Sequence, residues 1–141
     1  MFKKVNLQFL ISYLGLFPFL IILLDKLLLQ YFKPNIVKDF SVLYSLIIYV
    51  FIGAVNWNLR KNVSTKLIFL GFIPSFISIF IIIMFLFSFE VFHYLIIFFI
   101  LQLILDNFYY KGKFERNIYF KLRIPLTFFL VMCLIFIQLL F

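Results

Sequence analysis

The stretch LFSFEVFHYL, residues Leu86 to Leu95, decides how many times this chain crosses a membrane. It lies inside an apolar run from Leu67 to Tyr110 that is too long for one membrane-spanning helix. A hydrocarbon layer about 30 Å thick is crossed by about 20 residues, so the run must form two spans. Glu90 and His93 interrupt it, and we expect a tight hairpin there. This hairpin raises the number of predicted spans from four to five.

Composition shows which solvent surrounds the chain. Of 141 residues, 67% are hydrophobic and only 13% are charged, whereas soluble domains have about 25% charged residues. The apolar runs show no alternation of period two, which favours helices over barrel strands. We predict an all-α membrane protein with a single transmembrane domain over residues 1–141. Its five helices are expected at about 7–30, 40–59, 67–89, 91–110 and 124–141.

The positive residues predict the orientation. With five spans, ten of the 13 Lys and Arg residues fall on the side of the N-terminus, and Lys26, Lys33 and Lys38 fall on the other. Because Lys and Arg concentrate in cytoplasmic loops, we expect a cytoplasmic N-terminus and a C-terminus outside. The start of the chain does not resemble an organellar transit peptide, which favours the inner membrane of a bacterium. The net charge of +8 is then expected to face anionic lipid headgroups, not nucleic acid.

Residues that carry enzyme chemistry are scarce. The chain has one His and four Gly, and its five Asp and Glu residues are scattered. This pattern offers no zinc helix, no phosphate-binding glycine loop and no pair of carboxylates for acid–base catalysis. We therefore expect no catalytic residue, no metal site and no cofactor, and we do not expect an enzyme.

Small and hydroxyl-bearing residues recur on the second and third predicted helices at a spacing of one helical turn. Such residues let helix backbones approach closely and form hydrogen bonds between helices. The residues expected at these packing contacts are Ser41, Ser45, Gly53, Gly71 and Ser75.

A second group of polar residues falls at a similar depth in the cytoplasmic leaflet. Its members come from the second, fourth and fifth predicted helices: Asn56, Gln102, Asp106, Arg123 and Thr127. An unpaired carboxylate inside a span costs up to ~3 kcal/mol, so we expect Arg123 to pair with Asp106 across the short loop between them. Two interpretations remain open, an ion pair that locks the last two helices and a polar binding site.

The end of the second predicted helix has residues typical of a membrane surface. Trp57 sits near the headgroups, and Arg60 and Lys61 follow on the cytoplasmic side. We interpret these three residues as interface anchors.

Five short motifs resemble a known family. In chain order they are GLFPF (Gly15–Phe19), GAVNW (Gly53–Trp57), GFIPS (Gly71–Ser75), LQLILD (Leu101–Asp106) and LRIPLT (Leu122–Thr127). Together they resemble the domain-of-unknown-function 3429 family, which includes the eukaryotic transmembrane protein 69. The resemblance implies a small polytopic inner-membrane protein of bacteria and mitochondria. It implies no activity and no catalytic residue.

Two functions are expected from these features. The first is an accessory, structural or assembly role beside a larger membrane complex. The partners expected for the chain, whichever function holds, are other membrane subunits or further copies of itself. The alternative is an oligomeric transporter or channel for small solutes that uses the polar group in the cytoplasmic leaflet. A stoichiometric partner would favour the first function and a homo-oligomer the second.

Overall fold

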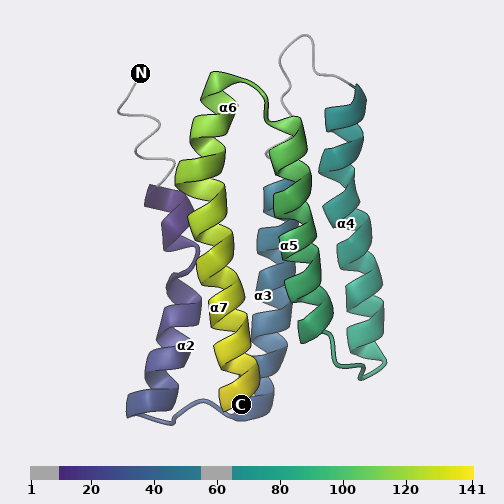
Figure 1. The fold of residues 1–141 in the computed structure, drawn as a ribbon. Helices are drawn as coiled ribbons and strands as arrows, with labels where there is room; N and C mark the ends of the chain where they lie inside the picture. The colour runs from purple at the N-terminus through teal and green to yellow at the C-terminus, as the bar shows by residue number, and fades with distance from the viewer. Residues whose placement is uncertain (1–9, 55–64) are drawn as a thin grey trace. The chain divides into compact units, whose positions relative to one another are not determined.

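The computed structural model describes residues 10–54 and 65–141, and every element in these ranges is a helix (Figure 1). The elements are α2 (Phe17–Leu28), α3 (Pro34–Ala54), α4 (Thr65–Leu86), α5 (Phe92–Tyr109), α6 (Lys113–Ile118), the π-helical turn η1 (Tyr119–Arg123) and α7 (Ile124–Leu140). Within these ranges, five helical segments are long and apolar enough to cross a membrane: Leu10–Leu28, Pro34–Ala54, Ile68–Leu86, Phe92–Tyr109 and Arg116–Leu140. The predicted all-α fold with five membrane-spanning helices is confirmed.

The hairpin between α4 and α5 lies inside Leu86–Leu95, where the sequence predicts it. Ser88 adopts a left-handed backbone conformation with φ of 61°. Its N–H donates to the carbonyl oxygen of Phe85 at 2.9 Å, and the N–H of Phe89 donates to that of Met84 at 3.1 Å. A left-handed residue with such back-reaching hydrogen bonds satisfies the last carbonyl groups of a helix. The chain can therefore reverse here without leaving these groups unpaired in the membrane.

Asp25 fixes the connection from α2 to α3. Its carboxylate accepts hydrogen bonds from the backbone N–H groups of Tyr31, at 3.1 Å, and Phe32, at 3.0 Å. Gln30, with φ of 51°, donates its N–H to the carbonyl oxygen of Asp25. The carboxylate is buried, and both of its oxygens have backbone donors, which makes burial of the charge tolerable.

Two helices begin earlier than the apolar runs predict. α3 starts at Pro34, because proline is favoured at the first position of a helix. The last span continues a helix that starts at Lys113, where the sequence predicts a loop up to residue 123. Hydropathy marks only the part of a helix that lies in hydrocarbon, and charged residues such as Lys and Arg are good helix formers in water.

The chain divides into two compact units, one of residues Met1–Ser41 and Phe98–Phe141 and one of Val42–Ile97. In the first unit, α2 and α7 run in the same direction. Near the start of both spans, the hydroxyl of Tyr13 donates a hydrogen bond to the carbonyl oxygen of Lys121. Near their ends, Lys26 Nζ lies 4.7 Å from the ring centroid of Phe141. The centre of this unit is apolar and fully buried: Phe19, Leu130, Leu134 and Ile137.

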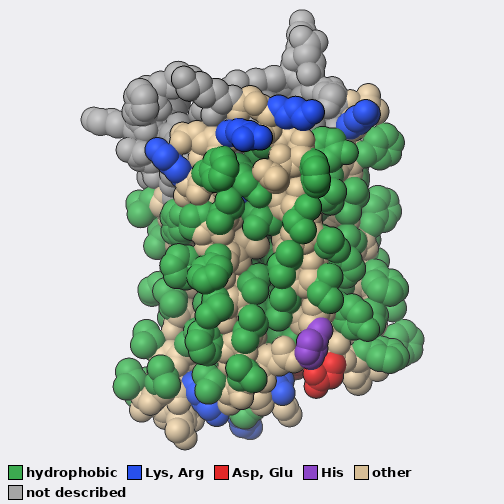
Figure 2. All heavy atoms as spheres, viewed as in Figure 1, with side chains coloured by type: hydrophobic (Ala, Val, Ile, Leu, Met, Phe, Trp, Pro, Cys, Tyr) green, Lys and Arg blue, Asp and Glu red, His purple; other side chains and the backbone are tan. Residues whose placement is uncertain are grey.

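The outer faces of the helices are apolar. Figure 2 shows hydrophobic side chains along the helices and Lys and Arg side chains near the helix ends. Many of the exposed residues are large, and Phe51, Phe76 and Phe87 are each at least 69% exposed. A surface of this kind is stable in lipid and would aggregate in water.

Candidate functional site

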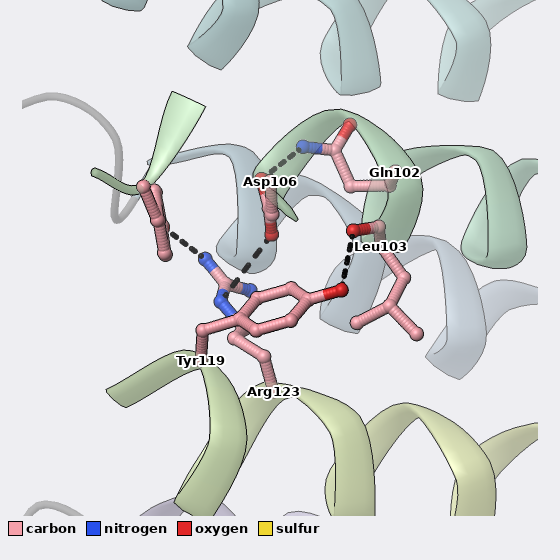
Figure 3. A network of polar contacts seen from close by, with 6 residues as sticks. Gln102, Leu103, Asp106, Tyr119 and Arg123 are labelled. Atoms are coloured by element: carbon pink, nitrogen blue, oxygen red, sulfur yellow. Dashed lines mark hydrogen bonds and ion pairs between the residues drawn. The ribbon is translucent and has the colours of Figure 1, made fainter. Parts of the chain in front are cut away.

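The buried carboxylate of Asp106 forms the centre of a polar cluster in the first unit (Figure 3). Gln102 lies one turn earlier on α5, and its Nε2 donates to Asp106 Oδ1 at 3.0 Å. The other carboxylate oxygen, Oδ2, lies 3.5 Å from Nε of Arg123, and both charged side chains are almost completely buried. We call this group, with Tyr110 and Tyr119, the Asp106 cluster.

Arg123 connects the ion pair to a tyrosine. Its Nη2 donates to the hydroxyl oxygen of Tyr110 at 3.3 Å, and Tyr110 is itself buried. The charges of Asp106 and Arg123 cancel, so the pair as a whole is neutral in its buried surroundings, where the dielectric constant is low. A buried pair of this kind adds little net stability, but removing one partner leaves an uncompensated charge.

Pro125 explains why the helix widens next to Arg123. Proline has no N–H group, so the carbonyl oxygen of Lys121 lacks its usual helical donor four residues later. The chain forms a π turn at Tyr119–Arg123 instead, in which the N–H of Ile124 donates to the carbonyl oxygen of Tyr119. The hydroxyl of Tyr13 donates to the carbonyl oxygen of Lys121 at 2.9 Å and replaces the missing bond.

The π turn directs two side chains toward α5. The hydroxyl of Tyr119 donates to the carbonyl oxygen of Leu103 at 3.2 Å, and Figure 3 shows Tyr119 and Arg123 reaching the same side of α5. The rings of Tyr119 and Tyr110 meet edge to face, with centroids 6.4 Å apart. Single π turns inside α-helices are rare and frequently occur at functional sites.

One acceptor of the Asp106 cluster remains open. Gln102 must point its Nε2 at the carboxylate, because its amide oxygen would repel Asp106. The oxygen Oε1 is buried and has no hydrogen-bond partner among the residues that the structure describes. A buried acceptor without a donor costs about 1–3 kcal/mol. The cluster can therefore take up one further hydrogen-bond donor at Gln102.

Three of the five residues predicted to share a polar group lie together in the structure, namely Gln102, Asp106 and Arg123. Thr127 is buried one turn beyond Arg123, and no hydrogen bond joins it to the other three within residues 10–54 and 65–141. Four predicted residues lie outside the described ranges: Asn56 of the polar group and the interface anchors Trp57, Arg60 and Lys61.

The predicted packing residues occupy a face of α3 and a face of α4. Ser41 and Ser45 are completely buried. In the second unit, a Cβ atom on Gly53 would lie 2.7 Å from the carbonyl oxygen of Gly71 and 2.7 Å from Cγ of Pro74. Ser75 is half-buried. At Gly53, the two backbones are too close to admit even a methyl group.

Tyr13, Tyr110 and Tyr119 were not predicted to belong to the polar group. Their roles depend on the π turn, and the signal for that turn is Pro125 two residues after a buried arginine. A proline inside a transmembrane helix leaves a carbonyl group that a neighbouring hydroxyl can satisfy.

The cluster can hold two helices together and can accept a hydrogen bond. Among the described residues, no three His, Cys, Asp or Glu side chains could hold a metal ion. The ion pair joins α5 to the last span, and the open oxygen of Gln102 accepts a hydrogen bond. This geometry supports two roles: holding α5 and the last span rigidly together, and binding a small hydrogen-bond donor at Gln102.

The comparison with known families covers nearly the entire chain. Residues 6–139 match the family described as "Protein of unknown function (DUF3429)". No curated protein and no solved structure matches the chain significantly. The matched range includes both helices of the ion pair, the π turn and the close approach at Gly53. The chain therefore belongs to the DUF3429 family of proteins of unknown function.

Proposed function

We propose that this integral membrane protein is a non-catalytic accessory, structural or assembly partner of a larger membrane complex. The observation that carries the proposal is the Asp106 cluster, in which the opposite charges of two helices neutralise each other. Asp106 and Arg123 are both buried, and Gln102 and Tyr110 add hydrogen bonds to the pair. Such a pair fixes the register of two helices and leaves their outer faces free for other contacts.

The outer face of α4 supports a subunit contact. Four phenylalanines on this helix are between 42% and 69% exposed: Phe69, Phe72, Phe76 and Phe80. Their spacing of three and four residues places them on one broad face. Rigid aromatic side chains lose little conformational entropy on binding and are enriched at protein interfaces. A neighbouring membrane subunit could cover this face in place of lipid.

The location and orientation belong to the same proposal. We place the chain in a bacterial inner membrane, with its N-terminus in the cytoplasm and its C-terminus outside, because ten of 13 Lys and Arg residues then face the cytoplasm. The parallel direction of α2 and α7 supports an odd number of crossings, since the first and last spans then point the same way.

A second candidate function is an oligomeric transporter or channel for small solutes. The buried oxygen Oε1 of Gln102 favours it, because this acceptor has no partner within the described ranges. A solute or a chain of water molecules with a hydrogen-bond donor could use such an acceptor. Five helices enclose a pore poorly, so this function requires several copies of the chain.

Photocrosslinking in living cells separates the two functions. A photoreactive amino acid at Phe76, 69% exposed on α4, should give one heterologous product of defined mass. The matched control is Phe128, 60% exposed on α7, which should give crosslinks to lipid alone. The same partner should purify with the protein at a fixed stoichiometry in mild detergent. A ladder of homo-oligomers would support the transporter, and only lipid crosslinks at both positions would refute the accessory role.

A further inference from the structure

Exposed positive side chains gather where α5 ends and the last span begins. Lys111, Arg116 and Lys121 are all exposed, and none of them pairs with a carboxylate in the described part of the chain. The neighbouring Arg123 differs, because it is buried and neutralised by Asp106. The three exposed cations, which we call the basic patch, present positive charge to the surroundings.

Ring contacts show that the chain segments carrying the basic patch lie close together. Lys111 follows Tyr110 directly, and the ring of Tyr110 lies 6.4 Å from that of Tyr119. Tyr119 in turn contacts Phe120, whose ring centroid is 5.4 Å away and which directly precedes Lys121. The end of α5 and the π turn are therefore neighbours, and Arg116 lies one turn before Tyr119 on the same helix.

An apolar lane runs along the exposed face of α5 and ends at Phe108, three residues before Lys111. Leu101, Ile104 and Phe108 are 46%, 47% and 66% exposed, at a spacing that places them on one helix face. Gln102 and Asp106 lie on the buried face of the same helix. The combination of an apolar lane and cations at its end matches the two parts of a membrane lipid, an acyl chain and a phosphate.

We propose that the basic patch and this lane form a binding surface for one anionic phospholipid. The phosphate group contacts Lys111, Arg116 and Lys121, and an acyl chain lies along Leu101, Ile104 and Phe108. A juxtamembrane cation strengthens binding to anionic lipid by about fivefold. Free phosphate would use the cations and ignore the lane, so the lipid is the ligand that accounts for both features.

Native mass spectrometry of the full chain in neutral detergent tests the proposal. The protein is mixed with equal amounts of dioleoyl phosphatidylglycerol and dioleoyl phosphatidylcholine. The unmodified chain should retain phosphatidylglycerol preferentially, and K111Q/K121Q should weaken this retention about 25-fold. The matched control K33Q/K38Q removes the same charge near the start of α3 and should retain the lipid. K111R/K121R keeps the charge and should also retain it, which shows that the positions accept substitution.

Three results would overturn the proposal. Equal weakening by K111Q/K121Q and K33Q/K38Q would mean that net charge alone attracts the lipid. Equal retention of the two lipids by the unmodified chain would mean that the patch does not select anionic headgroups. Displacement of phosphatidylglycerol by inorganic phosphate at the same concentration would assign the patch to free phosphate.

Discussion

The hydroxyl of Tyr13 donates a hydrogen bond to the carbonyl oxygen of Lys121 at 2.9 Å, across more than a hundred residues of sequence. Pro125 makes this bond necessary, because it cannot supply the N–H that a helical carbonyl group normally receives. The bond joins the segment before α2 to the π turn that carries Arg123. A single proline thus leaves a carbonyl group in the last span that a tyrosine of the first span satisfies.

Tyr13→Phe should lower the free energy of unfolding by about 1 kcal/mol, the usual net value of one hydrogen bond. Thermal and denaturant unfolding in detergent would measure the loss. The matched control is Tyr109→Phe, because Tyr109 is partly exposed and its hydroxyl makes no hydrogen bond to the described residues. In the Pro125→Ala background, residue 125 can donate to Lys121, so Tyr13→Phe should cost less. Equal costs in both backgrounds would show that Pro125 does not create the need for Tyr13.

Removing one member of the buried ion pair should be severe. Asp106→Asn and Arg123→Met should each lower the free energy of unfolding by about 3–5 kcal/mol, since each leaves the other residue of the pair as a buried charge without its partner. The double variant Asp106→Asn with Arg123→Met should cost clearly less than the two single changes together. Unfolding in detergent measures all three.

The control for the ion pair is Asp39→Asn, a change at an exposed carboxylate on α3. It should change stability by at most about 0.5 kcal/mol. If the double variant lost as much as the sum of the single variants, Asp106 and Arg123 would not act as a pair.

Gly53→Ala should destabilise the second unit by about 1–3 kcal/mol through overpacking. The added methyl would meet the carbonyl oxygen of Gly71 at 2.7 Å, and a backbone atom cannot move aside cheaply. Gly53→Leu should be worse. Leu43→Phe, at a position 45% exposed on the same helix, should matter little. Comparable losses at residues 43 and 53 would exclude a close helix contact at Gly53.

Reporter fusions test the proposed orientation. A fusion after Phe141 and an insertion within Lys111–Arg116 should report opposite sides of the membrane, the second of them cytoplasmic. The reason is that one span, Arg116–Leu140, separates the two positions. Signals from the same side would rule out the proposed threading of the last span.

The number of spans could be predicted from the sequence, because length and hydropathy decide whether a segment crosses a bilayer. The start of the last helix could not, since Lys113–Ile118 is polar and hydropathy does not distinguish a polar helix from a polar loop. The left-handed conformation of Ser88 could not be predicted either, because several polar residues in that hairpin could have adopted it.

The centre of the candidate site was predictable for a similar reason. Gln102 and Asp106 are four residues apart on one helix, and a carboxylate in a span demands a cation, which Arg123 supplies. The contributions of Tyr110 and Tyr119 depend on the π turn, which rotates the residues before Arg123 relative to an α-helix. Spacing rules that assume 3.6 residues per turn fail across such a turn. The sequence prediction for Asn56, a hydrogen bond to the Gln102 and Asp106 side chains, stays a prediction.

The length of the last helix has a consequence for the choice of membrane. Its three parts of 6, 5 and 17 residues extend about 40 Å at a rise of about 1.5 Å per residue. A hydrocarbon layer of about 30 Å covers only part of this length, so the end that holds Arg123 lies near the boundary between acyl chains and headgroups. A thicker bilayer draws the ion pair into hydrocarbon, and a thinner one hydrates it. Hydrophobic thickness therefore sets how strongly Asp106 and Arg123 hold their two helices together.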